Sequence, residues 1–131
     1  MNQKVFLISR ILLGLIFLVF GSNGLMMVLT GHGFIPMPPP KPEVMEKMQG
    51  LMAVGYLMPL VKSLQIISGI LLLSGKFINL AITLLSPIVV NILAVHIFID
   101  LSGLPLAVII TALMFVLIKG RWTYFKPLLL K

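Results

Sequence analysis

Four long runs of apolar residues constrain this chain more than any other feature. They cover residues 5–29, 57–75, 77–99 and 103–120 of the 131-residue sequence. A transmembrane α-helix needs about 20 apolar residues, so each run is long enough to cross a bilayer. Because the runs and their connections use nearly the whole chain, we predict an all-α integral membrane protein. Residues 1–131 should form a single four-helix transmembrane bundle, with no room for a separate soluble enzyme domain.

The composition also favours a membrane protein. Hydrophobic residues make up 60% of the chain and charged residues 10%, whereas soluble domains are nearer half apolar and a quarter charged. The absence of cysteine excludes thiol–disulfide chemistry, iron–sulfur clusters and cysteine zinc sites on this chain. Residues 21–24 lack the Ala-x-Ala cleavage pattern, so we expect the first run to be retained as a span.

Lysine and arginine divide unequally between the two predicted sides of the membrane. With the N-terminus inside, the inner side carries seven of them: Lys4, Arg10, Lys76, Lys119, Arg121, Lys126 and Lys131. The outer side carries only two, together with all three acids: Lys41, Lys47, Glu43, Glu46 and Asp100. The positive-inside rule therefore predicts that both termini are cytoplasmic. Topology and attraction to anionic lipid then explain the net charge of +7, and no nucleic-acid partner is expected.

Residues 30–56 form the one long connection, predicted to lie outside. Five of the nine prolines fall within residues 36–42, which predicts a stiff, polyproline-II-like loop. The apolar residues that follow recur at helical spacing, so we expect a short amphipathic helix at the membrane surface. We predict that a protein partner, or a second copy of the chain, binds here through exposed apolar side chains: Phe34, Ile35, Pro36, Met37, Met45, Met48 and Met52.

A few polar residues interrupt the spans, at similar depths in the outer half of the bilayer. At 1.5 Å per helical residue, they lie roughly 8–12 Å below the outer ends of three different spans. We predict that they line a ligand-binding pocket open to the outside, with a histidine at its rim: Asn23, Lys62, Gln65, Asn91 and His96. Neither a catalytic set nor a metal site is evident, and whether the chain is an enzyme stays open.

Other readings of these polar residues are also open. Lys62 could extend its amine outward to the membrane surface. Asn91 shares a stripe with Thr83 and Pro87, and could serve as a hydrogen bond between helices. Asp100, four residues after His96, could orient the imidazole ring.

Five residues of the first span, three of them glycine, recur at spacings of four and three. Arg10, Gly14, Phe17, Gly21 and Gly24 follow this pattern. Small residues let helices approach closely in membranes, so this stripe predicts a packing seam rather than a ligand site.

Four segments together suggest a family. They are FIPMPPP (34–40), GYLMPLVK (55–62), SPIVVNI (86–92) followed by His96, and FKPLL (125–129). In order and spacing, over essentially the whole chain, the sequence resembles small bacterial DoxX-like membrane proteins. The resemblance implies a four-span inner-membrane (plasma-membrane) protein, and the family's name comes from subunits linked to quinone-dependent oxidation of sulfur compounds. Members commonly have glutamate where this chain has Gln65, so Lys62 lacks the neutralising partner that the family pattern would supply.

Three functions follow as hypotheses. The first is an accessory, partner-binding protein that is a non-catalytic subunit of a larger membrane complex. The second is a quinone-binding subunit of a membrane oxidoreductase, because quinone oxygens need only hydrogen-bond donors; quinone is the one cofactor that this reading suggests. The third is a carrier or channel for a small anion drawn toward Lys62 from outside.

Overall fold

The computed structural model describes residues 1–131 as a succession of helices joined by short loops. The elements are α1 (Gln3–Thr30), α2 (Pro42–Met52), α3 (Leu57–Ser74), α4 (Ile78–Phe98), η1 (Leu101–Gly103), α5 (Leu104–Gly120), α6 (Trp122–Phe125) and η2 (Lys126–Leu129). Four segments are long and apolar enough to cross a membrane: α1, α3, α4 and Leu101–Gly120, which joins η1 to α5. The prediction of an all-α protein with four membrane-length helices is confirmed.

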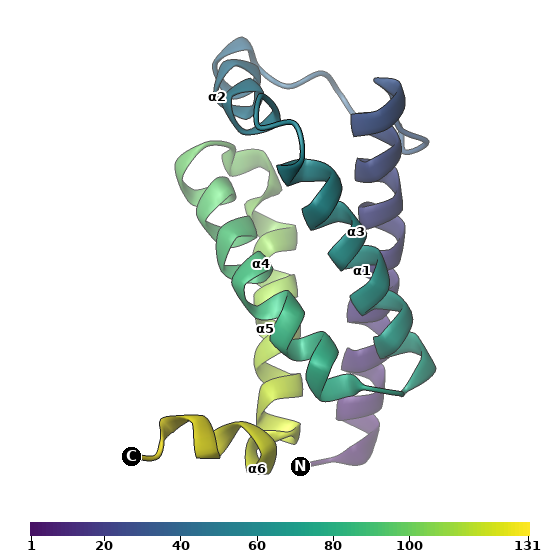
Figure 1. Ribbon diagram of the computed structural model, residues 1–131, viewed down its shortest axis with the longest axis vertical. Helices are drawn as coiled ribbons and strands as arrows, with labels where there is room; N and C mark the ends of the chain where they lie inside the picture. The colour runs from purple at the N-terminus through teal and green to yellow at the C-terminus, as the bar shows by residue number, and fades with distance from the viewer.

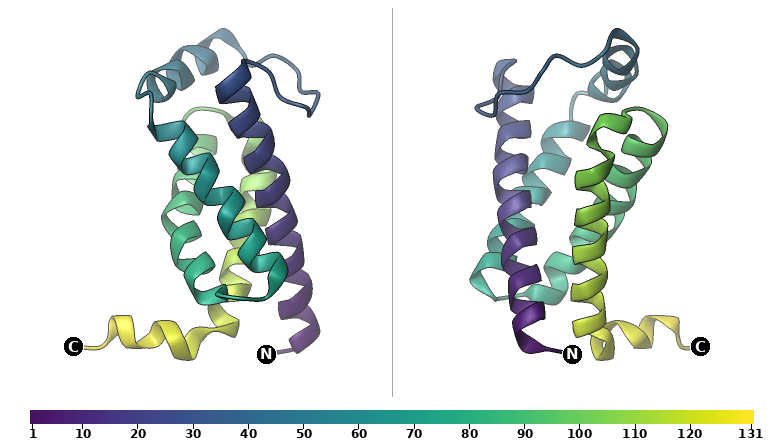
Figure 2. Two further views of the ribbon diagram at one scale, coloured as in Figure 1. Left: turned by 45° about the vertical axis from the view of Figure 1, so that its right-hand side comes forward. Right: turned by 180° about the vertical axis from the view of Figure 1, so that it is seen from behind.

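The four long helices run alternately up and down and form one bundle (Figure 1). Helices α1 and α4 each pack against both α3 and α5. Both chain termini lie at one end of the bundle, which we call the terminal end (Figures 1 and 2). Helix α2 and the loop before it lie at the opposite end, which we call the loop end.

Glycines end two of these helices. Gly31 follows α1 with φ 87°, and Gly75 follows α3 with φ 74°. Glycine adopts this left-handed conformation at no steric cost, which makes it the usual residue just past a helix end. At the end of α3, Nη1 of Arg10 also donates a hydrogen bond of 2.6 Å to the carbonyl oxygen of Leu72. A cation there complements the negative end of the helix dipole and ties α1 to α3.

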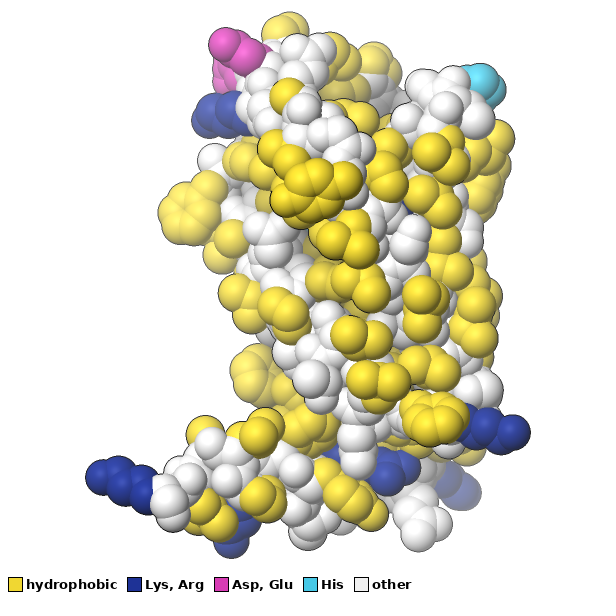
Figure 3. Space-filling model, in the orientation of Figure 1, with side chains coloured by type: hydrophobic (Ala, Val, Ile, Leu, Met, Phe, Trp, Pro, Cys, Tyr) yellow, Lys and Arg dark blue, Asp and Glu magenta, His cyan; other side chains and the backbone are white.

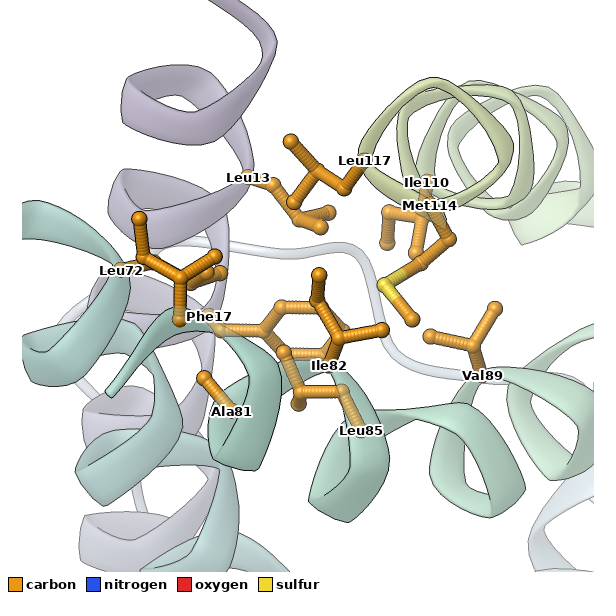
Figure 4. Close-up of a cluster of buried hydrophobic side chains, with 11 residues drawn as sticks. Leu13, Phe17, Leu72, Ala81, Ile82, Leu85, Val89, Ile110, Met114 and Leu117 are labelled. Carbon is orange, nitrogen blue, oxygen red and sulfur yellow. The ribbon is translucent and has the colours of Figure 1, made fainter. Parts of the chain in front are cut away.

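The apolar core joins all four long helices (Figure 4). The ring of Phe17 lies at its centre, beside Ile82 and Leu85 of α4. The cluster is Leu13, Phe17, Leu72, Ile78, Ala81, Ile82, Leu85, Val89, Ile110, Met114 and Leu117. Helix α3 contributes only Leu72, two residues before its end, and its other buried residues are Gln65, Ser68 and Gly69. Toward the loop end, α3 therefore presents polar and small residues to the bundle.

Charge separates along the bundle (Figure 3). Apolar side chains cover the middle of the visible face, the acids lie at the loop end beside some basic atoms, and most of the visible lysine and arginine atoms lie at the terminal end. Past α5, the segment formed by α6 and η2 extends sideways from the terminal end (Figure 1), with Trp122 and Tyr124 exposed. An apolar girdle between polar ends is the surface expected of a protein that contacts lipid.

Candidate functional site

Glycines bring α1 and α3 into close contact. A β-carbon on Gly69 would lie 2.9 Å from the carbonyl oxygen of Gly14 and from the amide nitrogen of Leu18, both backbone atoms. A β-carbon on Gly21 would lie 3.2 Å from the Cβ atom of Gln65. The packing seam predicted for α1 is confirmed, and Gly69 completes it from the α3 side. We call Gly14, Gly21, Gly24 and Gly69 the glycine seam.

Three polar side chains follow one side of α3 beside this seam. Lys62, Gln65 and Ser68 recur every third residue, and we call them the polar column. The chain of Lys62 crosses Gly24, where a β-carbon would lie 2.6 Å from its Cε atom. Gln65 is 3% exposed and Ser68 is fully buried. Glycine at position 24 therefore makes the space that Lys62 occupies between the helices.

The polar column has no partners within the chain. The hydroxyl of Ser68 is buried without a hydrogen bond, and Lys62 and Gln65 join none of the side-chain hydrogen bonds. By contrast, the hydroxyls of Ser63 and Ser86 donate to carbonyl oxygens four residues earlier. Burying an unpaired polar group costs free energy. An amine, an amide and a hydroxyl together could donate hydrogen bonds to a ligand that carries acceptor oxygens.

Asn23 has a different role from the pocket-lining one that we predicted. It is 3% exposed, and its Oδ1 atom accepts hydrogen bonds from the backbone N–H groups of Phe34 at 2.9 Å and Ile35 at 3.0 Å. Gly33 lies directly against the same amide, where a β-carbon would collide with it. Successive helical residues point about 100° apart, so Gly24 rather than Asn23 faces Lys62. Asn23 fastens the loop to α1.

Asn91 does not join Lys62 and Gln65 either. The inward face of α4 carries Leu85, Ile88 and Val89, all buried. Asn91 is six residues after Leu85, so it points about 120° away from the middle of this face, and it is exposed. We grouped Asn91 with Lys62 and Gln65 because of their similar depth in the membrane. That prediction is wrong, because the orientation of α4 about its own axis turns Asn91 away from them.

His96 packs under the turn between α4 and α5. Its Nδ1 atom lies 2.9 Å from the backbone carbonyl oxygen of Asp100, and its ring lies against Gly103. The carboxylate of Asp100 instead accepts hydrogen bonds from the N–H of Ser102 at 3.1 Å and from its hydroxyl at 2.6 Å. The hydroxyl bond is the main reason that the pKa of Asp100 lies below its usual range. The suggestion that the Asp100 side chain orients His96 is wrong, because the backbone carbonyl takes that place.

The residues predicted to bind a partner share the loop end. Phe34 and Met37 are more than half exposed, and Met45 and Met52 are 43% exposed. Three others complete the set: Pro36 is exposed, and Ile35 and Met48 are partly buried. No residue of α2 is fully buried, although α2 packs against α3.

Two residues gain importance only from the structure. Ser68 extends the polar column, and its spacing of six residues from Lys62 was the only signal in the sequence. Arg10, predicted simply as a member of the packing stripe, also caps α3.

A hollow of about 310 Å³ lies at the terminal end of the bundle. None of the predicted site residues lines it; its lining residues are Gly75, Phe77, Ile78, Asn79, Leu80 and Arg121.

No three or more of the chain's His, Cys, Asp and Glu residues lie together where they could hold a metal ion. Comparisons with protein-family models, curated proteins and solved structures give no match to this chain.

Proposed function

We propose that this chain is a DoxX-like, non-catalytic accessory protein of the bacterial inner membrane, which binds a protein partner through its loop end. The observation that carries the proposal is the attachment of the loop by Asn23. One buried amide holds two consecutive backbone N–H groups, at Phe34 and Ile35. A loop held in this way loses little conformational freedom when a partner binds.

The distribution of charge supports an orientation for this binding surface. The seven lysines and arginines expected inside belong to the terminal end, and the three acids belong to α2 and the turn after α4. By the positive-inside rule, the terminal end faces the cytoplasm and the loop end faces outward.

The side chains of the loop end are suited to protein contact. Phe34 and Met37 project from the attached loop, and α2 adds Met45 and Met52. Methionine side chains are flexible and adapt to irregular surfaces. In this proposal α2 lies at the membrane surface, with its polar residues toward water and its methionines toward the partner.

Loop replacement tests the proposal. Residues 34–42 are replaced by a Gly/Ser stretch of equal length, and the protein is purified in mild detergent with its bound proteins. A matched control replaces the exposed Leu128, Leu129 and Leu130 of the terminal end by serine. We expect the loop variant to lose its co-purifying partner and the control to retain it. Equal co-purification by the two folded variants would contradict the proposal.

The polar column favours a second candidate function, binding of a lipophilic quinone. The hydroxyl of Ser68 is buried without a partner, and Lys62 and Gln65 make no side-chain hydrogen bond, so all three can donate to the carbonyl oxygens of a quinone. Electrons would come from another subunit, because this chain carries no redox centre of its own residues. Stoichiometric quinone in the purified protein, lost in Lys62→Met and kept in Lys41→Met, would support this function. Its absence from protein purified out of quinone-rich membranes would oppose it.

A further inference from the structure

We propose that the exposed face of α4 is an interface with a second copy of this chain, and that Asn91 belongs to it. The interface is separate from the loop end and does not depend on the partner proposed there.

The exposed residues in the middle of the other spans are apolar. Examples are Leu12, Leu15, Val19 and Phe20 of α1, Leu60, Ile67 and Ile70 of α3, and Val108, Ile109 and Phe115 of α5. On α4 the exposed residues include Thr83 and Asn91. The hydroxyl of Thr83 donates to the carbonyl oxygen of Asn79 at 2.8 Å, which satisfies it within the helix. The amide of Asn91 has no such partner in the chain.

Asn91 lies deep in the span. It is thirteen residues after Ile78 and seven before Phe98, or about 20 Å and 10 Å along the helix from its two ends. Lipid chains cannot donate or accept hydrogen bonds, so an amide at this depth costs free energy unless another protein group pairs with it. Polar residues within spans usually face protein rather than lipid.

The surface around Asn91 suits the close approach of another helix. Six residues on this face recur at spacings of three and four: Leu80, Thr83, Pro87, Val90, Ala94 and Ile97. This is the spacing of a helix–helix seam, and small residues such as Thr83 and Ala94 allow backbones to approach. Pro87 has no N–H, so the carbonyl oxygen of Thr83 lacks its usual helical donor and can accept a hydrogen bond.

A second copy of the chain is the occupant that matches this surface. The amide of asparagine both donates and accepts, so two Asn91 side chains can satisfy each other. Two copies inserted in the same direction are related by a two-fold axis along the membrane normal, which places both Asn91 residues at one depth. Helix α4 carries no lysine, arginine or acid between Ile78 and Phe98, so two α4 faces do not repel each other.

Cysteine cross-linking in native membranes tests the interface, since the chain has no cysteine of its own. Val90→Cys places a thiol on the proposed face beside an intact Asn91, and Ile67→Cys places one on the exposed face of α3. Val90 is 69% exposed and Ile67 is 49% exposed. With a short bifunctional maleimide, we expect a dimer of this chain from Val90→Cys and only background from Ile67→Cys.

Adding Asn91→Leu to Val90→Cys should reduce the dimer yield about tenfold, the effect of one interhelical hydrogen bond in a membrane. Adding Asn91→Gln instead should retain most of the yield, because glutamine keeps the amide. Equal cross-linking at positions 90 and 67, no dimer from Val90→Cys, cross-linking only to a different protein, or a yield unchanged by Asn91→Leu would each overturn the proposal. The side chain of Asn91 makes no hydrogen bond within its own chain, so its variants should fold normally, which thermal unfolding checks.

Discussion

An asparagine lies at the seam between α1 and α3 and another on the exposed face of α4, and their surroundings differ. Asn23, beside the seam, is buried and binds two backbone N–H groups. Asn91, on α4, is exposed and has no partner within the chain. Both interrupt long apolar helices at similar depths. An intramembrane asparagine that is satisfied inside its chain therefore has a structural role, whereas one left unsatisfied indicates a contact with another molecule.

Lys62, Gln65 and Ser68 fall between these two cases. Gln65 and Ser68 are buried, as Asn23 is, and Lys62 lies against Gly24 of α1. None of the three makes a side-chain hydrogen bond within the chain, and in this they resemble Asn91. A ligand that enters the bundle would complete the polar column, while a second chain on the outside would complete Asn91. The two kinds of incomplete site lie on different helices and faces, so separate variants can test them.

The largest effect should come from opening the α1–α3 seam. Gly69→Leu would place a side chain where backbone atoms of Gly14 and Leu18 already lie within 2.9 Å of a β-carbon. Because backbone cannot move aside as a side chain can, we expect a loss of about 3 kcal/mol or more, measured as a lower unfolding midpoint in detergent. The control is Gly50→Ala in α2, where a β-carbon meets nothing within 4 Å. This control should stabilise slightly, by about 0.5–1 kcal/mol, and a Gly69 variant as stable as the control would refute the close contact.

Removing each asparagine tests the comparison directly. Asn23→Ala leaves the N–H groups of Phe34 and Ile35 without an acceptor, which should cost about 1–3 kcal/mol for each group that stays buried. Asn91→Ala removes nothing that its own chain uses, so the stability of the monomer should change by less than about 0.5 kcal/mol. Limited proteolysis within residues 31–41 should accelerate in Asn23→Ala alone. Faster cleavage in both variants would erase the distinction between the two residues.

A smaller effect should follow loss of the contact between Arg10 and the end of α3. Arg10→Met removes the hydrogen bond to the carbonyl oxygen of Leu72 and the favourable charge at the helix end. We expect a loss of about 1 kcal/mol and faster amide hydrogen exchange in the last turn of α3. Lys76→Met, at an exposed position next to the same turn, is the matched control. If the two variants exchange equally fast, Arg10 contributes only net charge.

The sequence predicted more of the fold than of the site, for a physical reason. The lipid requirement for about 20 apolar residues fixes a span within a few positions, so the expected range 57–75 and α3 (Leu57–Ser74) nearly coincide. The spacing of the glycines predicted the seam, because residues three and four apart lie on the same face of a helix and that face packs against α3. Lys62 and Gln65 were also grouped by depth, and they do lie together because they are three residues apart on one side of α3. Asn91 was placed with them by depth, but depth does not determine how α4 is rotated about its own axis.

The smallest predicted effect concerns a polar group at the edge of the bundle, where water competes with protein partners. The carboxylate of Asp100, in the turn after α4, accepts a hydrogen bond from the hydroxyl of Ser102, which holds the pKa of Asp100 below its usual range. Because the pKa is lower in the folded chain, the stabilisation is present above the unfolded value and is lost as the pH falls through the folded value.

Ser102→Ala removes this hydroxyl, so the pKa of Asp100 should rise toward its ordinary value near 4. It should stay slightly below that value, because the N–H of residue 102 still donates to the carboxylate. Titration of the Asp100 carboxyl carbon by NMR measures the shift, and Ser74→Ala, at the terminal end, is the control. An unchanged pKa in Ser102→Ala would mean that water replaces the hydroxyl fully. Hydrogen-bond partners from the chain would then affect a polar side chain only inside the membrane, where water cannot replace them. Asn23 has such partners and Asn91 does not.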